Sequence, residues 1–532
     1  MSLEKQGPLN VAVTSRSTME RGRIDPKSGV KRGLKVRHIS MMALAGIIGP
    51  GLFIGMGSAL HAGGPAGLLA GFAIVGLLVV VMMFSIGEMN SLFDFNFNTH
   101  ASRWVDPAFG AALGWNYAFL WVCNIIAEYV SVTSVLSFYS DKVPIYGYYL
   151  ILWFFFSIYQ MFGVDVFGEV EYILAFIKIL FLTGFYLFAV IFAAGGVKGK
   201  SPGNPFGDYP LAHGFKGVAN SFVYAGVFYT GIESLSITFS ESKNVKKSVR
   251  RAVSQSIFRI FFIYFGITIA YGITVAWNDE GLSAENKVMR SPMTIALINA
   301  GWANAGYFVT TIILVTCISS INSAVYFCGR CVLRLAVDGY APKIFAKVNK
   351  AGVPYVATNT VHLFGFLSLL SMQSSSAVAY SYIVGLAGVS AFIVWTGIIF
   401  AHYRFRKGWV RAGNSVSDLP FQAPLFPYFN YFGMLLGIVL CLVQGWTVFV
   451  PFQAGQFVDL YIMLPLFFVI WGVYKFYLKS KWVAYEDMDF VSERVDYEEH
   501  SPSIEDENSN SDLSSEPKDK KKAVWSFLWN YV

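Results

Sequence analysis

Met42-Ala-Leu-Ala-Gly-Ile-Ile-Gly-Pro-Gly-Leu-Phe-Ile-Gly-Met-Gly57 is the stretch from which the rest of the chain can be interpreted. It lies in residues 39–60, an apolar run of membrane-spanning length without an ionisable side chain. Its middle is nevertheless a poor helix, because glycine costs about 1 kcal/mol and proline about 3 kcal/mol relative to alanine in a helix interior. The residues responsible are Gly46, Gly49, Pro50 and Gly51.

This stretch predicts a transmembrane helix that is broken near the middle of the bilayer. Backbone groups released by such a break are tolerated only where protein or a water-filled cavity surrounds them. Transporters use these breaks to aim helix-end dipoles at charged parts of a substrate. The alternative is that the glycines form a small-residue face on which another helix packs closely.

The composition is that of a membrane protein. Of 532 residues, 55% are hydrophobic and 14% are charged, and the mean hydropathy is +0.51. Twelve apolar runs approach the roughly 20 residues that a transmembrane helix needs. We expect an all-α membrane protein whose twelve helices occupy a transporter domain, 39–480, between a cytoplasmic segment, 1–38, and an acidic, disordered cytoplasmic tail, 481–532. The runs lie at 39–61, 66–90, 110–138, 144–162, 166–193, 215–238, 254–277, 298–328, 354–372, 377–402, 430–450 and 457–477.

The distribution of basic residues predicts the orientation. With an even number of spans both termini lie on one side, and the loops on that side hold 24 Lys and Arg residues against 5 on the other. The positive-inside rule then places both termini in the cytoplasm. This asymmetry explains the net charge of +7, which therefore does not indicate nucleic-acid binding. We expect neither a cleavable signal peptide, because the first 38 residues are polar, nor a disulfide framework, because all five cysteines lie in or beside the runs.

Two predicted spans carry ionisable residues at membrane depth. Asn124 and Glu128 lie four residues apart and therefore on one helix face, and Glu171 and Lys178 share a face in the fifth span. Such residues are costly in lipid and indicate function by default. We expect Lys178 to find acceptors among the carbonyls that the broken span releases. The alternatives are a structural carboxylate at Glu128 and a lysine that extends to the cytoplasmic interface.

The sixth run repeats the interrupted pattern, with Gly226, Gly231 and Glu233 inside it. If the first ten spans form two five-span repeats of opposite topology, spans one and six are counterparts. Paired interrupted segments are the best sequence indicator of a transporter site. Tyr224, Phe228 and Tyr229 either close over a substrate or are simply packed.

Other polar features have more local interpretations. Glu88, at the end of the second run, is expected at the membrane interface, and 241–251 is expected to be a basic cytoplasmic loop. The eighth run has an unusually polar face for lipid surroundings. Its members are Ser319, Ser320, Asn322, Ser323 and Tyr326.

A series of motifs follows in order from about residue 33 to 480: Arg37-His-Ile with the Gly-x-x-Gly-x-Gly-Leu-Phe of the broken span, Gly114-Trp-Asn-Tyr117, Gly168-Glu-Val-Glu171 with Lys178, Gly231-Ile-Glu233, Glu241-x-x-Asn244, Asn322-Ser-x-x-Tyr326-x-x-x-Arg330, Ala341-Pro-Lys-Ile-Phe345, Gly352-Val-Pro354 and His402-Tyr-Arg-Phe-Arg406. This ordered set resembles the fungal amino acid permeases of the amino acid–polyamine–organocation superfamily. The resemblance implies a five-plus-five inverted repeat with two added helices, and proton-driven uptake across a plasma membrane.

The resemblance also implies a substrate site at the two breaks. The break in span one, with Gly46 and Gly49, is similar to the family's carboxylate site. There the Gly51 amide would donate to the carboxylate of a substrate, and the Ile47 carbonyl would accept from its ammonium group. The corresponding residues of span six are Val227, Phe228, Gly231 and Glu233.

The coupling residues are implied in the same way. Lys178 is similar to a lysine that occupies a sodium-like site in proton-coupled or uniporting relatives, and Ser319 would be its neighbour. The coupling proton would be carried by Glu233, Glu128 or Lys178, in an order that the sequence leaves open.

Two departures from the family pattern concern the substrate. Pro50 stands where relatives usually have threonine or serine, so a hydroxyl and an amide donor are missing from the carboxylate site. Val227 stands where relatives often have a gating aromatic residue, a role that Phe228 could take. These departures favour an atypical substrate such as carnitine or a polyamine as an alternative to an ordinary amino acid.

The expected function is proton-coupled import of an amino acid or related amine by alternating access, in a multi-pass plasma-membrane protein. A permease-like nutrient sensor is the alternative from another class. An enzyme is not expected, because no metal ligands and no nucleophile–base pair cluster at membrane depth. The expected partners are the substrate, protons and membrane lipids, with trafficking factors at the cytoplasmic termini. We expect no cofactor, no metal and no nucleic acid.

Overall fold

The structure, a computed structural model, describes residues 25, 28–46, 48–140, 142–197, 203, 205–208, 210–212, 214–284, 289–373, 376–449 and 451–494. Residues 1–24 and 495–532, which hold most of the two predicted terminal segments, lie outside the described part of the chain. Ile47, the expected ammonium acceptor, lies outside it too.

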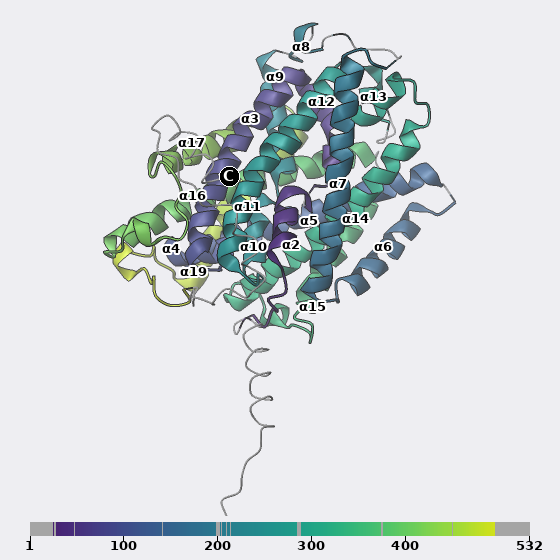
Figure 1. Ribbon diagram of the computed structural model, residues 1–532. Helices are drawn as coiled ribbons and strands as arrows, with labels where there is room; N and C mark the ends of the chain where they lie inside the picture. The colour runs from purple at the N-terminus through teal and green to yellow at the C-terminus, as the bar shows by residue number, and fades with distance from the viewer. Residues whose placement is uncertain are drawn as a thin grey trace, which may run out of the picture.

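Helices make up the regular structure of the described residues (Figure 1). The α-helices are α2 (Val36–Met41), α3 (Gly55–Leu92), α4 (Phe97–Trp104), α5 (Pro107–Tyr139), α6 (Ile145–Tyr159), α7 (Val164–Ala193), α8 (Pro205–Asp208), α9 (Phe215–Tyr229), α10 (Leu235–Phe239), α11 (Val245–Arg259), α12 (Gly266–Thr274), α13 (Pro292–Asn299), α14 (Ala305–Val337), α15 (Tyr355–Leu363), α16 (Ser376–Arg411), α17 (Tyr428–Val443), α18 (Ala454–Tyr461) and α19 (Met463–Leu478). Met42–Gly46 and Ile260–Phe265 are π-helical. The 3₁₀ segments are Pro50–Leu52, Ile232–Ser234, Glu280–Ser283, Lys343–Ala346, Phe364–Gln373, Val416–Asp418, Trp446–Val448 and Tyr485–Asp487.

Many of these helices suit a membrane. Among the described residues seven helices are long and apolar enough to cross one, and α18 and α19, bent by 46° at their junction, form an eighth span if they are counted as one. Two shorter helices, Ile145–Tyr159 and Tyr355–Leu370, are also apolar. The part of the chain that the structure describes is therefore helical, with several helices suited to cross a membrane.

Both predicted breaks are present. The first segment runs as α2 and the π-helical Met42–Gly46, leaves helical geometry at Ile48 and Gly49, and restarts at Pro50–Leu52. The sixth segment stops with α9 and restarts at Ile232–Ser234. The predicted interruption of these two segments is confirmed.

Several predicted boundaries are wrong. The seventh span begins at Val245 rather than 254, because the Asn244 side chain accepts from the Lys247 amide at 3.1 Å and caps a longer helix. Most of the expected basic loop 241–251 is therefore helical. The eighth span is Ala305–Val337 rather than 298–328. Helices can extend beyond the apolar run, as at Val245 and Val337. By contrast, residues 298–304 belong to the end of α13 and to the turn at Gly301, which precede α14.

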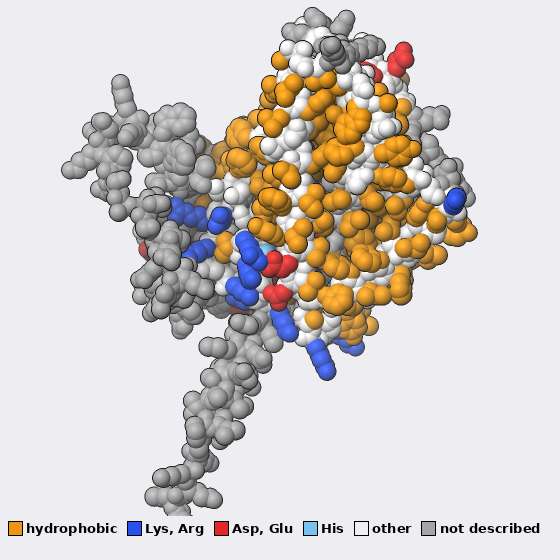
Figure 2. Space-filling model, turned by 45° about the vertical axis from the view of Figure 1, so that its right-hand side comes forward, with side chains coloured by type: hydrophobic (Ala, Val, Ile, Leu, Met, Phe, Trp, Pro, Cys, Tyr) orange, Lys and Arg blue, Asp and Glu red, His pale blue; other side chains and the backbone are white. Residues whose placement is uncertain are grey.

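Apolar side chains cover the outside of the bundle. Figure 2 shows hydrophobic side chains over most of one face, with most of its charged side chains gathered below them. Exposed large apolar residues are frequent on α6 and α7, for example Phe154, Leu180 and Leu187. Inside the bundle, α3 packs along α9, and α5 packs against both α14 and α16. This arrangement turns apolar side chains toward the lipid and keeps polar groups in the interior of the bundle.

Two buried ion pairs join distant parts of the chain. Glu88, expected at the membrane interface, is instead fully buried: it contacts the Arg406 guanidinium, and its Oε1 lies 3.1 Å from His402 Nε2. Glu241 pairs with Arg330 Nε at 2.5 Å and accepts from the Tyr326 hydroxyl at 2.7 Å. The expectation of an exposed carboxylate at Glu88 was wrong, because the residues that pair with it lie far away in the sequence.

The described ends of the chain meet the same face of the bundle. Arg32 pairs with Asp94 at 2.5 Å, while Arg103 pairs with Asp489 at 3.2 Å. Phe490 stacks on Trp104, with ring centroids 5.0 Å apart. Contacts with the bundle therefore continue beyond residue 480, and the division of the chain into a domain and a tail stays a prediction.

The Glu241–Arg330 pair generates a stability prediction. Glu241→Leu leaves the Arg330 guanidinium buried without its carboxylate, which should cost about 3–5 kcal/mol. We expect a clearly lower melting temperature for the detergent-solubilised variant in a fluorescence thermal-shift measurement. The double variant Glu241→Leu/Arg330→Met should recover most of the loss, because it leaves no buried charge. A single variant as stable as the wild type, or a double variant less stable than the single one, would contradict this account.

Candidate substrate site

The second half of span one begins as a helix at the break. Gly49 precedes this half-helix in an extended conformation, and Pro50 occupies its first position. Proline suits that position because its missing N–H would have no partner there and its backbone angle is already helical. The next amide, of Gly51, belongs to the first turn, whose N–H groups have no partner within the helix. Pro50 therefore starts the half-helix and leaves its positive end open.

The first half of span six ends at the opposite side of the same region. The Thr230 hydroxyl donates to the Gly226 carbonyl at 2.9 Å, and the Thr230 amide donates to the Val227 carbonyl at 3.1 Å. The chain then turns at Gly231, whose φ of +100° lies in the left-handed region that glycine adopts without strain. The C-terminal end of α9, with its partial negative charge, thus lies close to the break in span one.

The Glu233 side chain stabilises the point where span six becomes helical again. Its Oε1 accepts from the Gly231 amide at 2.9 Å, and its Oε2 accepts from Trp395 Nε1 at 2.9 Å. A carboxylate in the first turn of a helix is favoured by the helix dipole. Glu233 is fully buried and is turned toward its own helix start and α16.

A cavity of about 50 Å³ lies between the two breaks. That is more than the roughly 10–15 Å³ that one water molecule needs. The broken span one contributes Ile48, Gly49, Gly51 and Leu52; span six contributes Val227, Phe228 and Thr230; other helices contribute Trp121, Asn124, Ala127, Glu128, Tyr264, Ser320, Ile383 and Ala387. The start of one half-helix and the end of another therefore face one space.

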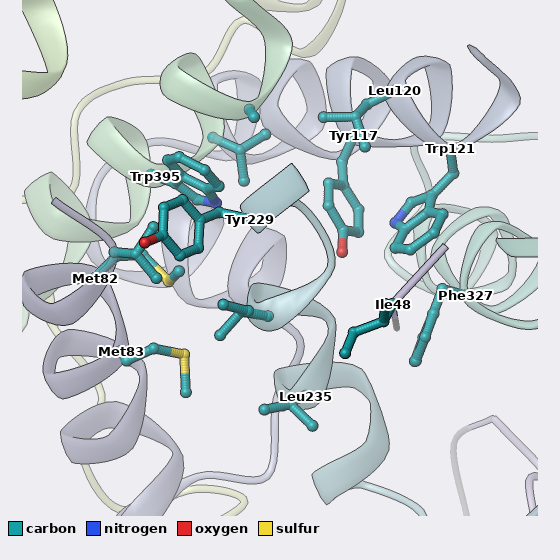
Figure 3. Close-up of a cluster of buried hydrophobic side chains, with 14 of the residues drawn as sticks. Ile48, Met82, Met83, Tyr117, Leu120, Trp121, Tyr229, Leu235, Phe327 and Trp395 are labelled. Atoms are coloured by element: carbon teal, nitrogen blue, oxygen red, sulfur yellow. The ribbon is translucent and has the colours of Figure 1, made fainter. Parts of the chain in front are cut away.

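Aromatic side chains of α5 and α14 pack around this region. Figure 3 shows Ile48 near Tyr117, Trp121 and Phe327. The Trp121 ring lies 5.2 Å from that of Phe327 and 5.9 Å from that of Tyr117, centroid to centroid. Trp121 also lines the cavity, so this cluster forms part of its wall.

Lys178 lies beside the break rather than at the interface. Its ammonium donates to the Ile48 carbonyl at 2.8 Å and to the Ser319 hydroxyl at 2.7 Å. Ser319 donates in turn to Glu171 Oε2 at 2.7 Å, and Asn322 donates to Glu171 Oε1 at 2.6 Å. The expected contact between this lysine and a carbonyl of the broken span is present, and α14 supplies the groups that complete it.

Glu128 faces the cavity from α5. Ser320 donates to its Oε1 at 2.8 Å, while its Oε2 is buried and has no hydrogen-bond partner among the described residues. A Cβ added to Gly49 would lie 2.7 Å from Glu128 Oε1 and 2.8 Å from Ser320 Oγ. Only glycine lets the backbone of the break approach this carboxylate so closely.

The structure separates the predicted site residues into groups. Gly49, Gly51, Val227, Phe228 and Glu128 line the cavity. Lys178 and Ser319 lie next to the break without lining it, and Gly231 and Glu233 stabilise the second break from behind the cavity. Gly46 ends the first half-helix. Of the span-six aromatic residues, Phe228 lines the cavity, whereas Tyr229 is buried and donates to the Phe72 carbonyl at 3.1 Å, as a packed residue does.

Some members of the site escaped the sequence analysis. Tyr264 lines the cavity, and Arg259 donates to its hydroxyl at 2.6 Å. Arg259 is an ionisable residue within the predicted seventh run, which is the signal that could have found it. Gln160, which donates to the Asn322 side chain at 2.7 Å, carried no comparable signal.

Two interrupted helices around a buried polar cavity are the arrangement of secondary transporters. The family model described as amino acid permease matches residues 38–485, and the chain belongs to that family. The family resemblance inferred from the motifs is confirmed, and the protein is a membrane transporter rather than an enzyme.

Individual relatives agree with this assignment. The chain is 61% identical to an uncharacterized amino-acid permease of Schizosaccharomyces pombe, over 95% of this chain and 93% of the relative. It is 44% identical to a general amino acid permease of Saccharomyces cerevisiae, over 84% of this chain and 80% of the relative. Among solved structures, a manganese transporter of Eremococcus coleocola is similar, with a TM-score of 0.52 and 12% identity over 83% of this chain and 94% of that chain, a likeness that concerns the fold alone.

The close approach at Gly49 generates a functional prediction. Gly49→Ala should push the Glu128 carboxylate and Ser320 apart and raise the KM for uptake by roughly tenfold, equivalent to about 1.4 kcal/mol. Gly184→Ala is a matched control, because this exposed α7 glycine has nothing within 4 Å of an added Cβ. The measurement is the KM for uptake by the two variants and the wild type, compared at equal surface abundance. An unchanged KM for Gly49→Ala would show that the spacing does not matter.

Proposed function

We propose that this protein imports an amino acid or closely related amine together with a proton. The observation that carries the proposal is the pair of helix ends at the cavity. The start of the Pro50–Leu52 segment presents amides, and the end of α9 presents carbonyls. Helix dipoles favour an anion at the first and a cation at the second. An amino acid zwitterion carries both charges within a few ångströms.

The side chains of the cavity suit this assignment. Val227 and Phe228 offer apolar surface to the substrate's own side chain, while Asn124 and Thr230 offer polar contacts. Although Pro50 itself offers no donor, it starts the half-helix, and the Gly51 amide remains available there for a substrate carboxylate. An amino acid therefore remains the leading substrate, as the names of the relatives suggest, with carnitine or a polyamine as the alternative.

Glu128 is the group best placed to couple a proton to the substrate. Its carboxylate lies in the cavity wall, with Oε1 beside Gly49, where the substrate carboxylate would bind. Its Oε2 is buried without a hydrogen-bond partner among the described residues. A proton on Glu128 removes a like charge from that position and adds a donor, so proton and substrate would each strengthen the binding of the other. Lys178 would hold the backbone of the break in place through its bond to the Ile48 carbonyl. Glu233 is a further candidate for carrying the coupling proton.

The finer architecture belongs to the same proposal. We place twelve spans as a five-plus-five inverted repeat with two further helices, in the plasma membrane, with both termini cytoplasmic and access to the cavity alternating between the two sides. The interruptions in the first and sixth segments and the excess of basic residues on one side support this arrangement. The cytoplasmic termini would be available to trafficking factors.

Transport separates this proposal from a nutrient sensor. Expressed in a host that lacks its own permeases, the protein should accumulate a radiolabelled amino acid, and a protonophore should abolish the accumulation. Unlabelled amino acids, carnitine and spermidine in excess then identify the substrate class by competition. A nutrient response without accumulation of any of these compounds would overturn the proposal in favour of the sensor.

The role of Lys178 can be tested separately. Lys178→Met leaves Glu171 and the Ile48 carbonyl without their cation, and we expect uptake driven by an imposed proton gradient to fall by roughly tenfold or more. Lys178→Arg keeps the charge and should retain part of the activity. Surface abundance of a fluorescent fusion controls for folding. Near-normal proton-driven uptake by Lys178→Met would remove this residue from the mechanism.

A further inference from the structure

Arg259 is a buried cation that the proposed mechanism leaves without a role. It ends α11, where the π-helical Ile260–Phe265 begins, and its side chain is 0% exposed. Among the described residues no carboxylate lies within ion-pair distance of its guanidinium, and its Nε has no hydrogen-bond partner. An isolated charge in the interior is expensive unless other groups compensate it. The compensating groups must therefore be dipoles.

One such dipole is the end of the first half of span one. Arg259 Nη1 donates to the Ala43 carbonyl at 3.4 Å. Ala43 belongs to Met42–Gly46, the last turn before the break. The last four carbonyls of a helix have no partner within it, and together they carry the negative end of its dipole.

The second dipole is the end of the first half of span six. Arg259 Nη2 donates to the Tyr264 hydroxyl at 2.6 Å, and that hydroxyl donates to the Phe228 carbonyl. Phe228 is the penultimate residue of α9, so its carbonyl also belongs to the last turn of a helix and has no partner within that helix. Tyr264 and Phe228 both line the cavity. Arg259 thus reaches the cavity wall through one intermediate side chain.

The two half-helices therefore point their negative ends at one guanidinium. Each end carries up to about half an elementary charge, so the two dipoles compensate part of the charge of the guanidinium. In other carriers the unwound carbonyls and half-helix ends of interrupted spans coordinate a sodium ion or a proton. The contacts of Arg259 are of this kind, with the cation supplied by the chain.

We propose that Arg259 is a built-in cation that positions the ends of the two half-helices and, through Tyr264, the wall of the cavity, in place of a bound metal cation. This inference rests on the proposed transport function. Arg259 is a positioning residue, because Tyr264 and not Arg259 lines the cavity. Lys178 differs from it, because Lys178 is joined to the Glu171 carboxylate through Ser319.

The test is amino acid uptake by Arg259→Ala at equal surface abundance, measured with and without millimolar guanidinium chloride. We expect a loss of about tenfold or more, since charge-assisted hydrogen bonds are lost at two places. Added guanidinium should restore part of the uptake, and Arg259→Lys should retain part of it. Arg251→Ala is the matched control, because Arg251 is an exposed arginine of the same helix. It should behave like the wild type.

Tyr264→Phe keeps the ring and removes the hydroxyl that joins Arg259 to Phe228. We expect its KM to rise roughly three- to tenfold. In the Arg259→Ala background the same change should add little, because both residues act through one connection. If Arg259→Ala does not reach the membrane, the kinetics of Tyr264→Phe decide the question.

Three results would overturn the inference while wild-type uptake stands. The first is normal uptake by Arg259→Ala. The second is a loss that neither the Arg259→Lys substitution nor added guanidinium restores. The third is wild-type kinetics for Tyr264→Phe. Absence of uptake by the wild-type protein would instead refute the proposed function. The two failures are therefore distinguishable.

Discussion

Lipid offers no hydrogen-bond partner to a backbone group, yet two segments of this protein leave helical geometry inside the bundle. Each released group must be satisfied by a specific side chain. Thr230 and Tyr264 cover carbonyls at the end of α9, Glu233 covers the amide at the restart, and Lys178 covers the Ile48 carbonyl. The remaining helix ends face the cavity, which is where a charged substrate can satisfy them.

The polar face of α14 connects the groups around the cavity. Neighbouring residues on this helix form hydrogen bonds with different carboxylates. Ser319 bonds to Glu171 and Lys178, whereas Ser320 bonds to Glu128. A small shift of α14 against α5 and α7 would therefore change the surroundings of both sites at once. This gives a physical route by which occupancy of the cavity and the charge state of its wall could influence each other.

The local features of the site could be predicted from the sequence. Short stretches around Pro50 and Gly231 predicted the two breaks, and hydropathy placed Glu128 and Lys178 at membrane depth. Partners far apart in the chain could not be found this way. Glu88 was expected at the interface because nothing near it indicates Arg406, which lies more than 300 residues further on.

The predicted helix boundaries were wrong for a related reason. Hydropathy locates the apolar middle of a helix, so the seventh span was predicted to start at 254, and Arg259 was not singled out. The helix begins at Val245, so that Arg259, its last residue, lies about four turns beyond its start. The family resemblance placed Glu233 at the substrate because it lies at the span-six break, whereas Gly231 and Trp395 set the direction of its side chain.

An experimental structure with a bound, transported amino acid tests the central claim most directly. The substrate carboxylate should lie within hydrogen-bond distance of the Gly51 amide at the start of the half-helix, and its ammonium group should face the carbonyls at the end of α9. An amino acid bound elsewhere, or spans one and six continuous through Gly49 and Gly231, would contradict the account.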